Sequence, residues 1–179
     1  MNNFLELCRQ RQSCRDFSDV PVERGKLMYC MEAAQLAPSA CNAQPWRFLV
    51  VTETQLARQV AKCLQGDGSM NSFTEHCPAF IILLLEKGNQ AARRFGELKK
   101  RNYGHTDLGI AAAHICLAAE AQGLGSCIIG FLDEDGLRGL LGLEEPDYPF
   151  LAVAIGYPKS SESRQKSRKA IEDIVRFFE

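Results

Sequence analysis

The sequence feature that most constrains the fold is a glycine- and alanine-rich stretch over residues 106–122, which we expect to form the longest helix of this 179-residue chain. Gly123 follows it and suits the C-terminal cap of a helix. Small side chains let another backbone approach closely, and a helix with such a surface is usually buried against a neighbour. Seven residues of this helix are that small: Gly109, Ala111, Ala112, Ala113, Ala118, Ala119 and Ala121.

Short strands and several further helices are predicted around it. Residues 79–85 are uniformly apolar, lie between Pro78 and Glu86, and predict a buried strand. Further strands are expected at 48–52, 127–131 and 150–155, and further helices at 4–11 (capped by Asn2 or Asn3), 23–36, 55–64 and 133–141. Residues 66–69 predict a loop, 89–101 a solvated helix or a mobile excursion, and 171–178 a closing helix or strand. This order suits an α+β fold about as well as a parallel α/β fold, in one domain over residues 1–179.

Composition and charge argue against several functional classes. The 21 basic and 22 acidic residues give a net charge of −1, which disfavours general binding to nucleic acid or to an anionic membrane. The longest apolar run has seven residues, whereas a membrane-spanning helix needs about 20. No charged leader precedes an apolar stretch, and no two cysteines have Cys-x-x-Cys spacing. We therefore expect a cytoplasmic protein with reduced thiols and no metal site.

Two cationic segments at opposite ends of the chain could together bind an anion. Arg11 and Arg15 flank Ser13 at the end of the first predicted helix, and guanidinium groups with a hydroxyl suit a phosphate monoester. Residues 163–169 hold four cations and no acid. Surface charge and a solvated tail are the competing interpretations. The phosphate hypothesis requires that the two segments meet in space.

Two other segments could contact a flat, polar ligand. Residues 38–48 contain a serine, an asparagine and a glutamine close together between two prolines, followed by Trp46. An ordinary turn with no ligand is the alternative interpretation of this segment. Residues 123–131 are apolar after a glycine pair, and Gly130 would let a flat ligand approach the backbone. A buried strand with a glycine kink is the alternative.

Taken together, these segments resemble the FMN-dependent nitroreductase family. The matching motifs occur in the family's order: Arg11/Ser13/Arg15/Phe17, Pro38/Ser39/Asn42/Gln44/Pro45/Trp46, residues 107–130, Gly156/Tyr157/Pro158 and Lys166/Ser167/Arg168. The resemblance covers nearly the whole chain and implies a central mixed or antiparallel sheet flanked by helices, in an intertwined homodimer. At one position this chain differs from some family members: it has Thr74 where they carry a lysine near the flavin. Because a positive charge there would stabilise the anionic reduced flavin, its absence leaves the reduction potential of the flavin undetermined.

The resemblance also implies which residues hold FMN. Phosphate ligands would be Arg11, Ser13, Arg15, Lys166 and Arg168, with Gln12 near the ring or the ribityl chain. Pro38, Ser39, Ala40 and Asn42 would come from the second subunit, and Asn71 would face the pyrimidine edge. Residues Ile128, Ile129 and Gly130 would line the ring, with backbone N–H groups near its reactive nitrogen.

The implied activity is NAD(P)H-dependent reduction of a nitroaromatic, a quinone or a similar electron-poor small molecule by a ping-pong mechanism. FMN would carry the chemistry, so no side chain is assigned as catalytic. Two alternatives stay open on the same fold: another flavin reaction (dehalogenation, ring fragmentation or heterocycle oxidation) and a non-catalytic flavin-binding protein. A nucleotide-binding module without flavin is a weaker one. The cations Arg93, Arg94, Lys99, Lys100 and Arg101 could contact an anionic substrate or the additional phosphate of NADPH, or form a solvated face.

Overall fold

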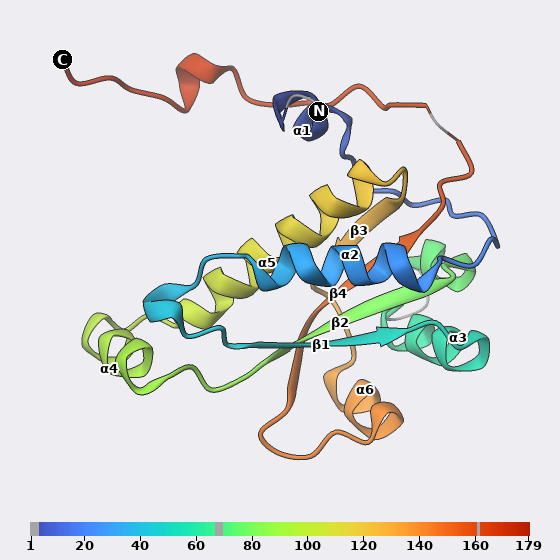
Figure 1. Ribbon diagram of the computed structural model, residues 1–179, viewed down its shortest axis with the longest axis horizontal. Coiled ribbons are helices and arrows are strands. Elements are labelled where there is room, and N and C mark those ends of the chain that lie inside the picture. The colour runs from blue at the N-terminus through green and yellow to red at the C-terminus, as the bar shows by residue number, and fades with distance from the viewer. Residues whose placement is uncertain (1–3, 67–69, 161) are drawn as a thin grey trace.

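A single antiparallel sheet forms the centre of the molecule. The computed structural model describes residues 4–66, 70–160 and 162–179, so the caps expected at Asn2 or Asn3 and part of the 66–69 loop lie outside the described residues. Four strands, β1 (Trp46–Val51), β2 (Ala79–Leu85), β3 (Gly125–Ile129) and β4 (Tyr148–Gly156), pair in the order β1-β2-β4-β3 (Figure 1). All three pairings are antiparallel. This excludes the parallel α/β alternative.

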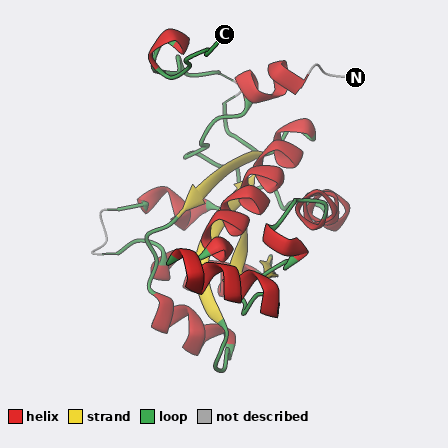
Figure 2. Ribbon diagram, turned by 90° about the vertical axis from the view of Figure 1, so that its left-hand side faces the viewer, coloured by secondary structure: helices red, strands yellow, loops and turns green. Residues whose placement is uncertain are grey.

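Helices cover both faces of this sheet (Figure 2). Phe80, Ile82 and Leu84 of β2 pack with α3 (Thr54–Cys63) and α6 (Glu134–Leu141). Ile81 and Leu83 point to the other face, where they pack with α2 (Arg24–Gln35) and α5 (Tyr103–Ala121). Because successive side chains alternate across a strand, an all-apolar strand requires cover on both sides. The α+β class with flanking helices is therefore confirmed.

Helix α5 is the long small-residue helix that the sequence predicts. The Asn102 side chain accepts a hydrogen bond from the Gly104 N–H at 3.0 Å and caps its start. Gly123 adopts φ +74° after its end, as a C-terminal cap requires. The buried face of α5 packs with α2, while Gly109 and Ala113 lie on an exposed face.

The remaining elements show where the sequence predictions erred. β3 begins two residues before the expected range, at Gly125, because the glycine-rich turn is already extended. Of the two alternatives predicted for residues 89–101, the helix is confirmed: α4 (Gln90–Lys99) forms there, capped by Asn89. The closing helix or strand expected at 171–178 is wrong: only a short 3₁₀ segment, η3 (Ile171–Asp173), forms there.

The C-terminal tail leaves the body of the molecule. It passes beside the short helix α1 (Phe4–Gln10) and runs outward (Figure 1). Its apolar side chains are exposed, and Phe177 and Phe178 reach 80% and 84%. No surface of the described chain covers them, which explains why no long regular element forms there. Within the described residues, no helix is long and apolar enough to cross a membrane.

Candidate functional site

The N-terminal cationic segment is held along the edge strand β3. The Cys14 N–H donates to the Ser126 carbonyl at 2.9 Å, and Ser13 forms a parallel bridge with Ser126. A side chain at Gly125 would place its Cβ 2.7 Å from Cys14, so only glycine permits this close approach. Phe17 is 1% exposed and anchors the far end of the segment in the core. The position of Ser13 and its neighbours is therefore fixed by the sheet.

The C-terminal cationic segment meets this N-terminal segment, as the phosphate hypothesis requires. The Gln12 amide nitrogen donates to the Glu162 carbonyl at 2.9 Å, and its oxygen accepts from the Arg164 N–H at 3.1 Å. The Arg164 guanidinium donates to the Ser13 carbonyl. Segments separated by about 150 residues in sequence thus lie side by side. We call residues 11–15 and 162–168 together the cationic cradle.

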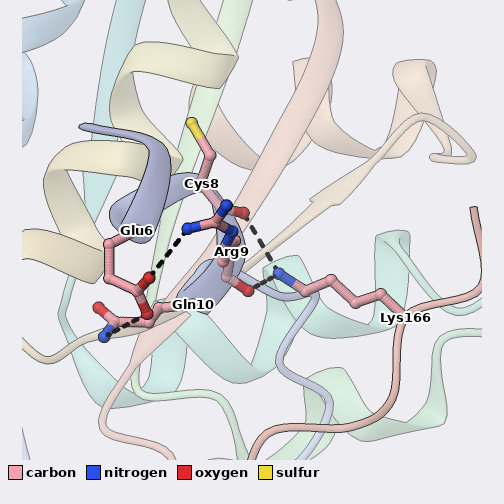
Figure 3. A network of polar contacts seen from close by, with 5 residues as sticks. All are labelled: Glu6, Cys8, Arg9, Gln10 and Lys166. Carbon is pink, nitrogen blue, oxygen red and sulfur yellow. Dashed lines mark hydrogen bonds and ion pairs between the residues drawn. The ribbon is translucent and has the colours of Figure 1, made fainter. Parts of the chain in front are cut away.

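Lys166 is the best-anchored cation of the cradle. Its Nζ donates to the carbonyls of Cys8 at 3.3 Å and of Arg9 (Figure 3), and also to the Arg11 carbonyl at 2.7 Å. These carbonyls lie in the last turn of α1 and directly after it, where unpaired acceptors and the helix dipole favour a positive charge. Lys166 therefore joins the tail to α1 as well as bringing charge to the cradle.

The electrostatics of the cradle show excess positive charge. Partial burial lowers the pKa of Lys166, and the positive charges of Arg11 and Arg168 lower it further. Glu120, half-buried near the end of α5, faces this group; burial raises its pKa, and the charges of Lys166 and Arg11 oppose that rise. One carboxylate beside three cations leaves room for an anion. A phosphate dianion would relieve the repulsion that lowers the pKa of Lys166.

A second side of the cradle lies over Cys127. Burial raises the pKa of the Cys127 thiol, whereas the charge of Arg15, a hydrogen bond with Ser13 and the charge of Arg164 lower it. Ser13, Arg15 and Arg164 therefore gather at one place on β3. Together with Arg11, Lys166 and Arg168 they provide one hydroxyl and five cations.

The residues expected to line a flavin ring follow along the same edge of the sheet. Ile129 is buried, whereas Ile128 is 44% exposed and Gly130 is exposed. A Cβ built at Gly130 would meet only Leu151, at an ordinary 3.6 Å, so the chain itself does not require glycine there. A glycine at position 130 leaves open space in which a ligand could approach the backbone, and this is one physical reason for a glycine there.

Asn71 lies on the turn beside this edge. Its side chain donates to the Leu64 carbonyl at 2.9 Å, while the Asp133 N–H binds the adjacent Cys63 carbonyl at 2.7 Å. The amide nitrogen of Asn71 thus has a structural bond, and no described residue donates a hydrogen bond to its side-chain oxygen. Thr74 is fully buried, and its hydroxyl donates to the Asn71 carbonyl at 2.8 Å. Its role is to hold this turn.

The loop of Pro38, Ser39, Ala40 and Asn42 lies far from the cradle of its own chain. The Ala40 N–H donates to Asp107 at the start of α5, whereas Glu120 marks the cradle near the end of that helix. Thirteen helical residues separate these positions by about 20 Å. Figure 1 shows this loop, with the 3₁₀ turn η1 (Ala40–Asn42), beside α4. One chain does not bring the two groups together, as expected if a second copy supplies the loop.

Neither thiols nor metal ligands suggest another chemistry. Burial raises the pKa of Cys30 and of Cys77 to about 12, so these thiols are poor nucleophiles. Among the described residues, no group of three or more His, Cys, Asp or Glu could hold a metal ion.

Sequence reasoning missed one residue of the cradle and one acidic residue that faces it. Arg164 was counted among the cations of 163–169 but was not assigned to the site, although its charge in that segment was a usable signal. Glu120 gave no signal, because it lies 46 residues before Lys166 in the sequence.

Comparisons with known proteins agree with this fold. The model of the family described as "Nitroreductase family" matches residues 8–157. The chain is 28% identical over 203 residues to an oxygen-insensitive NADPH nitroreductase of Helicobacter pylori, covering 95% of this chain and 94% of that protein. It is 28% identical over 183 residues to an iodotyrosine deiodinase of Thermotoga neapolitana, covering 96% and 97%. A crystal structure of a nitroreductase family protein from Streptococcus pneumoniae superimposes with a TM-score of 0.82 at 25% identity, covering 98% of this chain and all of that one.

Proposed function

Because the chain belongs to the nitroreductase family, we propose that it is an FMN-dependent oxidoreductase that acts as a homodimer. In this proposal it takes a hydride from NADH or NADPH and reduces a small electron-poor acceptor, such as a nitroaromatic compound or a quinone. FMN dependence is general for this family.

The observation that carries the proposal is the cationic cradle. A phosphate monoester needs several cations and directed donors. The cradle supplies Arg11, Arg15, Arg164, Lys166 and Arg168, and the Ser13 hydroxyl lies among them. Burial lowers the pKa of Lys166 most, and the positive charges of Arg11 and Arg168 lower it further, so an anion placed here would offset mutual repulsion among these cations. The donor set therefore fits the FMN phosphate.

The rest of the site would position the ring. The backbone at Ile128–Gly130 and the side-chain oxygen of Asn71 lie along one edge, where they would bind the polar rim of a flavin. Bound FMN would accept and donate the hydride, because that chemistry belongs to the cofactor. The residues of this chain bind and orient it. One open face used in turn by donor and acceptor predicts ping-pong kinetics.

The second copy is needed to complete the site. Pro38 and Asn42 are exposed and lie at the opposite end of α5 from the cradle of their own chain. The exposed face of α5 at Gly109 and Ala113 and the exposed apolar tail provide surfaces for such an interface. In the proposed dimer, each copy places this loop over the site of the other.

Reductive dehalogenation is the second candidate reaction. It is favoured by the similarity to the deiodinase over 96% of the chain. The same cradle and ring edge would serve it, so only the acceptor would differ. Assays with a halogenated phenol and with a nitroaromatic, each driven by NADH or NADPH, distinguish the two.

Titration of the cofactor-free protein with FMN tests the proposed site. Quenching of flavin fluorescence should saturate at one FMN for each chain. Arg168→Ala should raise the dissociation constant about tenfold or more, since it removes a charge-assisted contact. Arg176→Ala removes an equally exposed cation from the tail and should leave FMN affinity unchanged. Equal affinities for Arg168→Ala and the unaltered protein would remove Arg168 from the site.

A further inference from the structure

A cavity of about 520 Å³ lies between α4, the start of α5 and the end of β2. Its walls include the apolar side chains of Leu85 and Ala92, the ring of Tyr103 and Pro146. A Cβ at Gly104 would lie 2.7 Å from a terminal methyl of Leu85, so a side chain there would have to displace the end of the Leu85 side chain beside this cavity. The cavity is separate from the cradle, which none of its lining residues contributes to.

The charges that line this cavity are mainly positive. Lys87, Arg93, Lys100 and Arg101 line it, and none of them forms an ion pair within the described residues. Three acids also line it: Glu86, Glu97 and Asp107.

One of these acids is already paired within the protein: Glu86 lies 3.3 Å from Arg47. Asp107 is 3% exposed; its Oδ1 accepts from the Ala40 N–H at 3.1 Å, and its Oδ2 has no hydrogen-bond partner among the described residues. Glu97 forms no ion pair within the described part of the chain. The lining therefore sets four unpaired cations against two unpaired acids, which leaves it with excess positive charge.

The cavity is physically joined to the loop that the proposed function places at the flavin of the other copy. The Asn89 side chain, which caps α4, donates to the Cys41 carbonyl in η1 at 2.9 Å. Ala43 and Pro45, which follow that turn, also line the cavity. In the dimer, the cavity would therefore lie beside the open flavin face, within reach of a reactant docked there.

We infer that this cavity binds an anionic group, a carboxylate or a phosphate, carried by a reactant docked on the flavin. The inference rests on the proposed function for its location and names the substrate class. Guanidinium groups suit both anions because their planar donors match oxygen pairs. The anion could be a carboxylate on the acceptor or the additional phosphate of NADPH, and the experiment separates the two sources.

Calorimetric titration of the FMN-loaded protein, without reductant, tests the acceptor. We expect para-nitrobenzoate to bind more tightly than the uncharged para-nitrobenzamide. Arg93→Gln/Arg101→Gln should reduce this preference about threefold to tenfold, as loss of two solvent-screened charge contacts implies. Arg93→Lys/Arg101→Lys should retain it. The matched control is Arg94→Gln/Lys99→Gln, which removes the same charge from α4 at residues that do not line the cavity.

Titration with NAD⁺ and NADP⁺, which have no hydride to donate, forms the second arm. A preference for NADP⁺ that falls in Arg93→Gln/Arg101→Gln assigns the anion to the donor phosphate, and a nitrobenzoate preference that falls assigns it to the acceptor. If neither preference falls, or if the Arg94/Lys99 control falls equally, the inference is overturned. Binding is read without turnover, so a preserved charge preference in a protein that fails to oxidise NAD(P)H would contradict the proposed function alone.

Discussion

The side-chain oxygen of Gln12 accepts a hydrogen bond from the backbone N–H of Arg164 at 3.1 Å, across 152 residues of sequence. The nitrogen of the same amide donates to the Glu162 carbonyl. One side chain thus holds the C-terminal segment against the N-terminal segment through both of its polar atoms. Because both atoms are occupied, Gln12 acts here as a positioning residue of the cradle.

Loss of the Gln12 hydrogen bonds should make residues 162–168 more mobile without unfolding the core of the protein. Gln12→Ala removes three hydrogen bonds, the third being a 3.4 Å contact from the Arg164 side chain, and each contributes about 0.5–1.5 kcal/mol. We expect faster tryptic cleavage after Arg164, Lys166 and Arg168, together with weaker FMN binding. Gln10→Ala is the control, because its side chain donates a hydrogen bond to Glu6 within α1 and forms none with the C-terminal segment as described. Unchanged cleavage at these sites in Gln12→Ala would show that other contacts hold the tail.

Glu120 should make the cradle sensitive to pH. Burial raises its pKa from 4.5, so the folded state favours the protonated form. Stability contributed by that form is present at low pH and is lost as pH rises through the pKa of the folded protein. The ionised carboxylate then also competes with a phosphate for Arg11 and Lys166.

Glu120→Gln should remove both effects. FMN should bind about two- to fivefold more tightly to this variant once Glu120 is ionised in the parent, with no difference at pH values below 4.5. Ionisation of the phosphate itself affects both proteins equally and cancels in the ratio. Fluorescence titration across pH measures the ratio of the two FMN dissociation constants. A ratio independent of pH would show that Glu120 does not affect anion binding at the cradle.

Gly125 should be essential for the approach of the N-terminal segment. Gly125→Ala places a methyl group 2.7 Å from Cys14 and should cost about 1–3 kcal/mol in the free energy of unfolding. Gly139→Ala in α6 is the matched control, since no atom lies within 4 Å of its added Cβ. That control should gain about 0.5–1 kcal/mol from higher helix propensity. Urea denaturation measures both, and equal stabilities would contradict the close packing.

The exposed tail should hold the proposed dimer together. Ile174→Ser/Phe177→Ser/Phe178→Ser removes three side chains that are 61%, 80% and 84% exposed in one chain. If a second copy covers them, light scattering should shift from about twice the chain mass of 19.9 kDa toward the chain mass itself. Glu172→Ser/Asp173→Ser/Glu179→Ser, in the same tail, should leave the dimer intact. A monomeric parent protein at micromolar concentration would contradict the dimer.

Local sequence signals predicted most of the fold. β2 was predicted to the residue, because a central strand covered on both faces is apolar throughout and ends at Pro78 and Glu86. The start of α6 after Asp133 was likewise confirmed, and the Asp133 side chain caps it by accepting from the Gly136 N–H at 2.9 Å. β3 was placed two residues late, since Gly125 and Ser126 resemble turn residues until Cys14 pairs beside them.

The candidate site was less predictable because it depends on contacts across the chain. The sequence indicated the cations of both segments but could not show that Gln12 joins them, nor that Glu120 faces them. Thr74 stands where some family members carry a lysine near the flavin, and the sequence did not indicate that it is buried and bonded within its turn. The tail conformation was out of reach, since its apolar residues have no covering surface within one chain.

The central claim is that the cradle holds an FMN that takes electrons from NAD(P)H. The most direct test is the visible spectrum of the FMN-loaded protein without oxygen, before and after addition of NADH or NADPH. We predict a yellow protein whose flavin absorbance bleaches on addition of at least one of the two donors and returns when an electron-poor acceptor is added. A protein that cannot be loaded with FMN, or a yellow protein that neither donor bleaches, would contradict the account.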